Sequence, residues 1–211
     1  MGVHDLWLFL MAGVLLNITP GPDMALIIAR SAQHGTRSGI VAALGVGVGA
    51  FIHISAAAIG ISALIVASAL AFSLLKLIGA VYLTYLGIQM LRSSVKNKPR
   101  LETPQPLPSE GLRQIFVQGI LTNALNPKVA IFFLAFLPQF VDVDAPSKVS
   151  SLIMLGLLFD AVGTMWNIAV AWFAGKFATT NAYFRLKVWI ERAIGALFIF
   201  LGIKLAFAER S

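Results

Sequence analysis

The chain has 211 residues, of which 58% are hydrophobic and only 12% are charged, and it contains no cysteine. Soluble domains carry about a quarter charged residues, so this composition predicts an all-α integral membrane protein and excludes disulfides and thiolate metal sites. The net charge of +7 comes without basic clusters interleaved with aromatic residues, so we expect contact with a lipid bilayer and no nucleic-acid partner.

Six stretches reach the length of about 20 apolar residues that a helix needs to cross the hydrocarbon layer. They are Leu6–Ala29, Gly39–Ile61, Leu70–Leu91, Ile115–Leu137, Val149–Phe173 and Val188–Phe207. The first stretch lacks the basic start and the cleavage site of a signal peptide, so we expect it to remain as a span. We expect residues 92–114 to form a proline-rich polar linker between two three-span halves, about 1–91 and 115–211, of a single transmembrane domain.

Basic residues are distributed unevenly over the six-span arrangement. Eleven of the sixteen lysines and arginines fall in or next to the three loops that follow spans one, three and five. Because basic loops stay in the cytoplasm, this distribution predicts that both termini lie outside it.

Spans one and four are both interrupted. Span one contains Thr19-Pro20-Gly21-Pro22-Asp23, and span four contains Asn126-Pro127-Lys128. Proline removes a backbone donor and clashes with the preceding turn, so each motif should unwind its helix locally. Corresponding breaks in two halves of a membrane chain are typical of the binding site of a transporter.

The two halves also resemble one another in sequence. Gly13-x-x-x-Asn17 recurs as Gly119-x-x-x-Asn123, and the triplets IGA and LGI of span three recur in the same order in span six. A shift of 107 residues aligns Gly49 and His53 of span two with Gly156 and Asp160 of span five. Since each half has three spans, the second half must be inserted upside down, which predicts an inverted-topology repeat. Each of these two spans has a face of small residues, which fits packing within one chain or between two copies, so a homodimer stays open. The face of span two consists of Gly45, Gly49, His53, Ala56 and Gly60.

Four ionisable side chains lie inside the predicted spans, where a charge is costly and indicates function. Asp160 fits a proton-coupling carboxylate or a structural partner of Lys128. Lys128 fits a counter-charge for a substrate carboxylate, a partner of Asp23 or Asp160, or a lysine that extends to the membrane surface. Asp23 fits a contact to a substrate ammonium, a cap of the second half-helix, or both. His53 fits a proton relay or a merely hydrogen-bonded histidine.

The breaks offer further groups for binding. Free carbonyls suit an ammonium and half-helix N-termini suit a carboxylate, so a small zwitterion fits better than a metal ion, a phosphate or a sugar. We expect no cofactor and no metal. The predicted substrate-binding set is Asn17, Thr19, Pro20, Gly21, Pro22, Asp23, Asn123, Asn126, Pro127, Lys128 and Asn167, and the predicted proton-coupling residues are Asp160 and His53.

Several motifs together resemble one known family. Thr19-Pro20-Gly21-Pro22-Asp23, His34-Gly35-x-x-x-Gly39, Tyr82-Leu83-x-Tyr85-Leu86-Gly87 and Leu121-Thr122-Asn123-x-x-Asn126-Pro127-Lys128 are similar to those of the LysE/RhtB-type amino-acid exporters, over essentially the whole chain. The resemblance implies a multi-pass protein of the bacterial inner membrane that exports amino acids, coupled to the proton gradient. It also implies that both proline motifs belong to the shared core of the family.

The leading hypothesis is therefore secondary export of a small neutral amino acid of the threonine, homoserine or leucine type, by proton antiport with alternating access. Export of a basic amino acid or another small solute, and a passive channel, are the alternatives. An intramembrane enzyme that pairs Asp23 with Asp160 is disfavoured, because the chain has no HExxH motif, no Gly-x-Ser-x-Gly motif and no cysteine.

Overall fold

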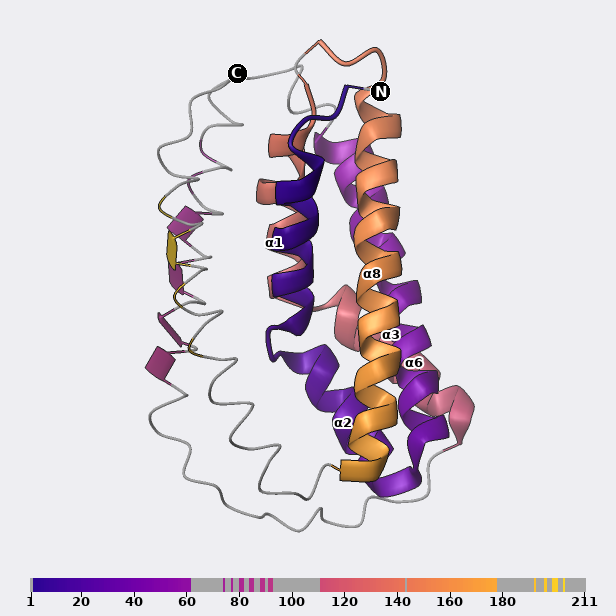
Figure 1. Ribbon diagram of the computed structural model, residues 1–211. Coiled ribbons are helices and arrows are strands. Elements are labelled where there is room, and N and C mark those ends of the chain that lie inside the picture. The colour runs from indigo at the N-terminus through magenta and orange to yellow at the C-terminus, as the bar shows by residue number, and fades with distance from the viewer. Residues whose placement is uncertain are drawn as a thin grey trace.

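The computed structural model describes residues 2–61, 111–142 and 144–177, with scattered residues between 74 and 92 and between 192 and 203. All regular elements in this part are helical (Figure 1), in agreement with the predicted all-α class. Most of predicted spans three and six, and most of the linker, lie outside the described residues. The repeated IGA and LGI triplets fall largely there as well.

Predicted span one is a broken helix. It consists of α1 (Leu6–Ile18) and α2 (Pro22–His34), whose axes differ by 50°. α2 begins at Pro22 because proline suits the first helical position, where no N–H is needed. Thr19 ends α1, and its N–H and its hydroxyl both donate to Leu15 O. α2 continues past the expected end at Ala29, so Arg30 lies buried inside a helix rather than in a loop.

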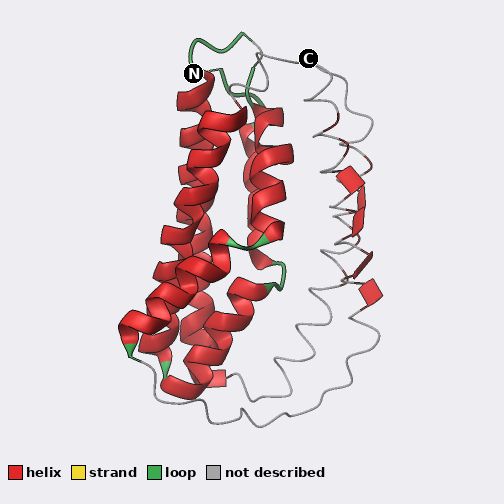
Figure 2. Cartoon of the chain, turned by 180° about the vertical axis from the view of Figure 1, so that it is seen from behind, coloured by secondary structure: helices red, strands yellow, loops and turns green. Residues whose placement is uncertain are grey.

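Predicted span four is broken in the same way. α6 (Leu112–Ala124) is followed by α7 (Pro127–Ile131), the π-helical turn η2 (Phe132–Phe136) and the 3₁₀ turn η3 (Leu137–Phe140). The bend between α6 and the segment that follows it is 44°. Asn126 caps α7 by accepting from Lys128 N at 3.0 Å. Figure 2 shows the breaks of spans one and four as green loops about halfway along the helices.

Predicted spans two and five are long helices. α3 (Thr36–Ala56) continues into the π-helical turn η1 (Ala57–Ile61), and α8 runs over Lys148–Phe177. Both are long and apolar enough to cross a membrane, and each bent pair also qualifies if it is counted as one span. Gly35, with φ 83°, makes the tight connection between α2 and α3.

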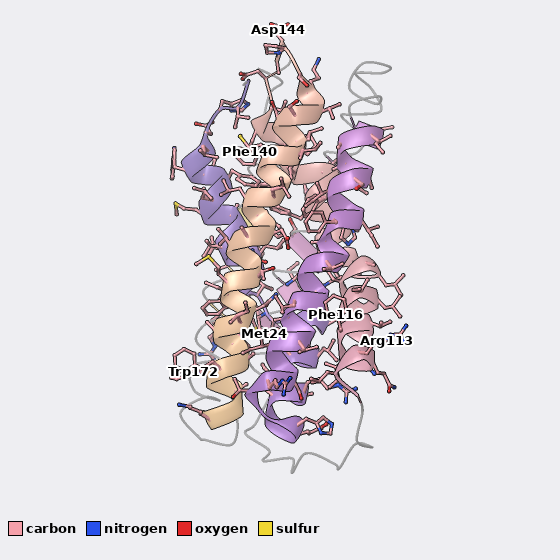
Figure 3. The ribbon with its side chains drawn as sticks, turned by 90° about the vertical axis from the view of Figure 1, so that its right-hand side faces the viewer. Met24, Arg113, Phe116, Phe140, Asp144 and Trp172 are labelled. Carbon is pink, nitrogen blue, oxygen red and sulfur yellow. The ribbon has the colours of Figure 1, made fainter. Side chains whose placement is uncertain are left out.

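The two broken spans run in opposite directions. Val3 pairs with Val141 in an antiparallel bridge, so the start of α1 lies beside the end of η3. Figure 3 shows Phe140 and Asp144 near one end of the molecule and Arg113 and Trp172 near the other. This direction is the one that an inverted repeat requires for its first and fourth spans.

α3 packs closely against α6 through glycines. A Cβ on Gly45 would come 2.2 Å from Phe116 O, and a Cβ on Gly49 would come 2.7 Å from Ile120 O. Packing therefore accounts for these two members of the small-residue face of span two. Ala56, the last residue of α3, and Gly60, in the π-helical turn that follows, are exposed.

A cluster of phenylalanines fills the end of the bundle that holds the N-terminal segment. Phe132 stacks on Phe159 of α8 with ring centroids 4.7 Å apart, and Phe9 of α1 meets Phe140 edge to face at 5.3 Å. All four rings are buried. The cluster joins α1, α8 and the segment after the second break, and so it fixes the position of the second break beside the first.

Candidate functional site

The two proline breaks meet in the middle of the bundle and hold each other by hydrogen bonds. We call Thr19, Asp23, Asn123, Asn126 and Lys128 the break cluster; all five residues are buried. Two belong to the first break and three to the second. Their bonds cross between the breaks, so neither break can change its conformation without disturbing the other.

Asp23 of the first break accepts hydrogen bonds from the second. Asn123 Nδ2 and Asn126 Nδ2 both donate to Asp23 Oδ2, each at 2.9 Å. Asp23 lies in the first turn of α2, where the free N–H groups of the helix also favour a negative charge. The sequence predicted Asp23 as a cap or a substrate contact, but it did not predict the two amides that hold it.

Lys128 of the second break donates to the first in turn. Its Nζ lies 3.1 Å from Leu16 O, which also accepts from Thr19 N, and 2.9 Å from Thr19 O; both carbonyls lie at the end of α1. Among the described residues no ion pair joins Lys128 to Asp23 or Asp160. With 9% of its surface exposed, Lys128 also does not extend to the membrane surface. Its observed contacts hold the end of a half-helix, a role that the sequence did not predict, whereas a contact to a substrate carboxylate stays a prediction.

A cavity of about 30 Å³ lies beside the break cluster. Helices α1, α2, α3, α6, α7 and α8 all contribute to its lining. The predicted site residues in the lining are Asn17, Thr19, Asp23, Asn123, Lys128, Asp160 and Asn167. Such a volume holds a water molecule or two, well below the roughly 300 Å³ or more of a ligand pocket. The cavity as it stands is therefore too small for an amino acid.

Three polar atoms of the cavity lining lack hydrogen-bond partners among the described residues. They are Asp23 Oδ1, Asn123 Oδ1 and Asn17 Nδ2, and each atom is buried. A buried polar atom without a partner costs about 1–3 kcal/mol, so the protein gains if a ligand supplies one. Two of the three are acceptors, one of them charged, and the third is a donor. This set matches a ligand that carries both a cationic donor and an acceptor.

Asp160 and His53, the predicted proton-coupling residues, lie in different surroundings. Asp160 lines the cavity, and Thr164 Oγ1 donates to its Oδ1 at 3.4 Å. His53 lies behind the cavity, 7% exposed, with Nε2 2.9 Å from Asn123 O. Because a carbonyl can only accept, Nε2 must carry the hydrogen. His53 thus holds the end of α6 in place, while Asp160 faces the ligand space.

The remaining predicted residues shape the backbone around the cavity. Pro22 and Pro127 begin α2 and α7 and are themselves exposed. A Cβ on Gly21 would lie 3.2 Å from Lys128 Nζ, so glycine leaves room for the ammonium. Pro20 does not line the cavity, and Asn126 acts through Asp23.

Two further residues of the cavity lining, Met24 and Thr164, were not predicted from the sequence. Thr164 lies one helical turn after Asp160, a spacing that could have identified it. Among the described residues no three histidine, aspartate or glutamate side chains come together in a way that could hold a metal ion.

Comparison with known proteins relates the whole chain to one family. Residues 14–209 match the family model of the LysE type translocators. An uncharacterised membrane protein of Pseudomonas aeruginosa is 31% identical, with 100% of this chain and 99% of that protein covered. A leucine efflux protein of Salmonella typhimurium is 29% identical, with 97% and 96% covered, and one of Enterobacter sp. is 28% identical over the same shares. No solved structure matches the chain.

Proposed function

The chain belongs to the LysE type translocator family, a family of multi-pass membrane proteins, and from that premise we propose that it exports small neutral amino acids from the cytoplasm. The substrate class is of the threonine, homoserine or leucine type. Relatives named as leucine efflux proteins, aligned over almost their whole length, support this class. Export runs by alternating access with protons as the counter-ion.

The observation that carries the proposal is the set of buried polar atoms without partners around the cavity. In the proposed complex the ammonium of the substrate donates to Asp23 Oδ1 and Asn123 Oδ1. The carboxylate accepts from Asn17 Nδ2 and from Lys128, whose third N–H is not used by its two carbonyl partners. Asp23 then faces the ammonium and Lys128 faces the carboxylate, and this pair of opposite charges favours a neutral amino acid over a basic one.

The small volume of the cavity supports alternating access over a passive channel. A free amino acid does not fit into about 30 Å³, so binding requires the helices around the break cluster to separate. We propose that they separate toward one side of the membrane at a time. The breaks are suited to this movement because their backbone is not held by a continuous helical ladder.

Proton coupling is assigned to Asp160, with His53 as a supporting residue. Asp160 is the acidic residue of the lining that no amide holds, so its charge is free to change with its surroundings. Uptake of a proton there removes one negative charge from the cavity and weakens its hold on the ammonium. The orientation with both termini outside the cytoplasm rests on the basic loops, and the location is the bacterial inner membrane.

Efflux from proteoliposomes tests the proposal. Purified protein is reconstituted in vesicles that contain labelled leucine, threonine, homoserine, alanine or lysine, and release is followed with and without an imposed pH gradient. We expect release of neutral amino acids that accelerates with the gradient and continues against a substrate gradient. Release that never runs uphill would establish a channel instead. Release of lysine alone would overturn the neutral substrate, and no release of any amino acid would overturn the proposed function.

A further inference from the structure

A second and larger pocket lies between α1 and α8. Its volume is about 280 Å³, and it is lined by Val14 and Ile18 of α1 and by Val162, Met165, Trp166 and Ala169 of α8. Asn17 also lines it. Among the described residues of this lining none is charged, in contrast to the cavity beside the break cluster. We call this space the side pocket.

Asn17 connects the side pocket to the cavity of the break cluster. Its side chain lines both spaces, and it packs directly on Gly163 of α8. A Cβ on Gly163 would come 2.7 Å from Asn17 Oδ1 and 3.0 Å from Asn17 Nδ2. Glycine at position 163 therefore allows the carboxamide to lie in the contact between α1 and α8, with a polar space on one side and an apolar space on the other.

We propose that the side pocket receives the aliphatic side chain of the transported amino acid, while its ammonium and carboxylate occupy the break cluster. This inference rests on the proposed function and deepens it. Asn17 then lies where the α-carbon of the substrate passes between the two spaces. Rotation of its carboxamide opens the connection, and Nδ2, which has no hydrogen-bond partner among the described residues, bonds the substrate carboxylate.

The size and the lining of the side pocket select the chemical class. An engineered apolar cavity of about 150 Å³ holds benzene, which has six carbons, so 280 Å³ accommodates the four carbons of a leucine side chain with room to spare. A charged side chain would meet no counter-charge among the lining residues. One methylene more or less in the side chain of the substrate changes the selectivity of an apolar pocket by about 10- to 200-fold.

A lipid chain is the competing occupant, because the side pocket is partly open and Met165 is 73% exposed. The two occupants differ in what a change of pocket volume does. If the substrate enters the pocket, a smaller volume changes the ratio of leucine to alanine transport. If lipid enters it, this ratio stays the same, since alanine and leucine then use only the polar cavity.

Two variants with opposite effects on the pocket test the inference. Ala169→Phe fills the side pocket, and the matched control Ala161→Phe adds the same ring at an exposed position of α8 outside both linings. In proteoliposomes we expect Ala169→Phe to lower leucine efflux relative to alanine efflux by at least about tenfold. Ala161→Phe should keep the ratio of the unchanged protein. An unchanged ratio in Ala169→Phe would overturn the inference.

Met165→Ala enlarges the pocket at an exposed residue, so it tests the inference even if Ala169→Phe does not fold. We expect phenylalanine efflux to rise at least about tenfold relative to leucine efflux; an unchanged ratio would overturn the inference. If the unchanged protein prefers threonine or alanine to leucine, the aliphatic occupant is wrong although the proposed function stands. If the unchanged protein releases no amino acid, the proposed function fails and this inference fails with it.

Discussion

Replacement of the Asn126 side-chain nitrogen by oxygen, in the variant Asn126→Asp, should destabilise the protein strongly. Asn126 accepts from Lys128 N with Oδ1, and donates to Asp23 Oδ2 with Nδ2. Asn126→Asp keeps the size of the side chain and the cap of α7, because a carboxylate oxygen accepts from Lys128 N equally well. It replaces the donor toward Asp23 with a second negative oxygen. The substitution thus tests the crossed bond between the breaks and little else.

The loss of folding free energy can be calculated from the observed distance between Asn126 Nδ2 and Asp23 Oδ2. Two unit charges 2.9 Å apart repel by about 6 kcal/mol at an effective dielectric constant of 20. A proton shared between the two carboxyl groups relieves this repulsion, but the hydrogen bond to the charged acceptor, about 1.5–3 kcal/mol, is lost in any case. We therefore expect a loss of between about 2 and 6 kcal/mol. For a chain of this length, that lowers the melting temperature by at least about 4 °C.

The transposed pair supplies the control. Adding Asp23→Asn to Asn126→Asp restores one donor and one acceptor in the opposite order. Asn123 must then turn its amide to offer Oδ1, which costs no bond because Oδ1 has no partner among the described residues. We expect the double variant to recover at least half of the lost melting temperature in detergent. Its efflux should stay low, because the charge that faces the substrate ammonium has moved from α2 to the start of α7.

Two results would refute this reasoning. Asn126→Asp could melt within a degree or two of the unchanged protein, in which case the bond between the breaks contributes little to stability. The double variant could melt no higher than Asn126→Asp alone, in which case the loss has another origin than the facing carboxylates.

Three further predictions follow from the same contacts. Lys128→Met should cost about 1.5–3 kcal/mol and abolish efflux, because two carbonyls lose their charged donor; melting and efflux assays check both. Asp160→Asn should abolish the stimulation of efflux by a pH gradient, whereas Asp144→Asn in the exposed loop should retain it, and equal stimulation of both would contradict the coupling role. Gly49→Ala should lower the free energy of unfolding by about 1–3 kcal/mol, because the added Cβ pushes α3 away from Ile120 O. Gly60→Ala, whose Cβ would have nothing within 4 Å, should leave the melting temperature unchanged.

The breaks could be predicted from the sequence because their cause is local. Pro22 and Pro127 lack the N–H that an uninterrupted helix would need, and each begins a new helix in the structure. The opposite direction of the two broken spans also follows from the sequence, through the odd number of spans in each half. The bridge between Val3 and Val141 agrees with it.

The bonds within the site could not be predicted in the same way. Asp23 and Asn126 are 103 positions apart, and nothing in their local sequence indicates that a single oxygen of Asp23 accepts two amides. The sequence left Lys128 with a charged partner or a place at the membrane surface, and it did not indicate the hydrogen bonds to Leu16 O and Thr19 O. The periodicity of span two assumes a regular helix, so it did not indicate the π-helical turn that contains Gly60. The side pocket depends on packing between α1 and α8, which no sequence pattern reports.

Substrate protection of a single cysteine tests most directly whether the break cluster is the transport site. The chain has no cysteine of its own, so Met24→Cys places one thiol in the lining of the cavity and Met11→Cys places one on the exposed face of α1. With a small methanethiosulfonate reagent, we predict that leucine slows labelling at position 24 and leaves labelling at position 11 unchanged. Equal labelling rates at position 24 with and without leucine, in protein that exports leucine, would contradict the account.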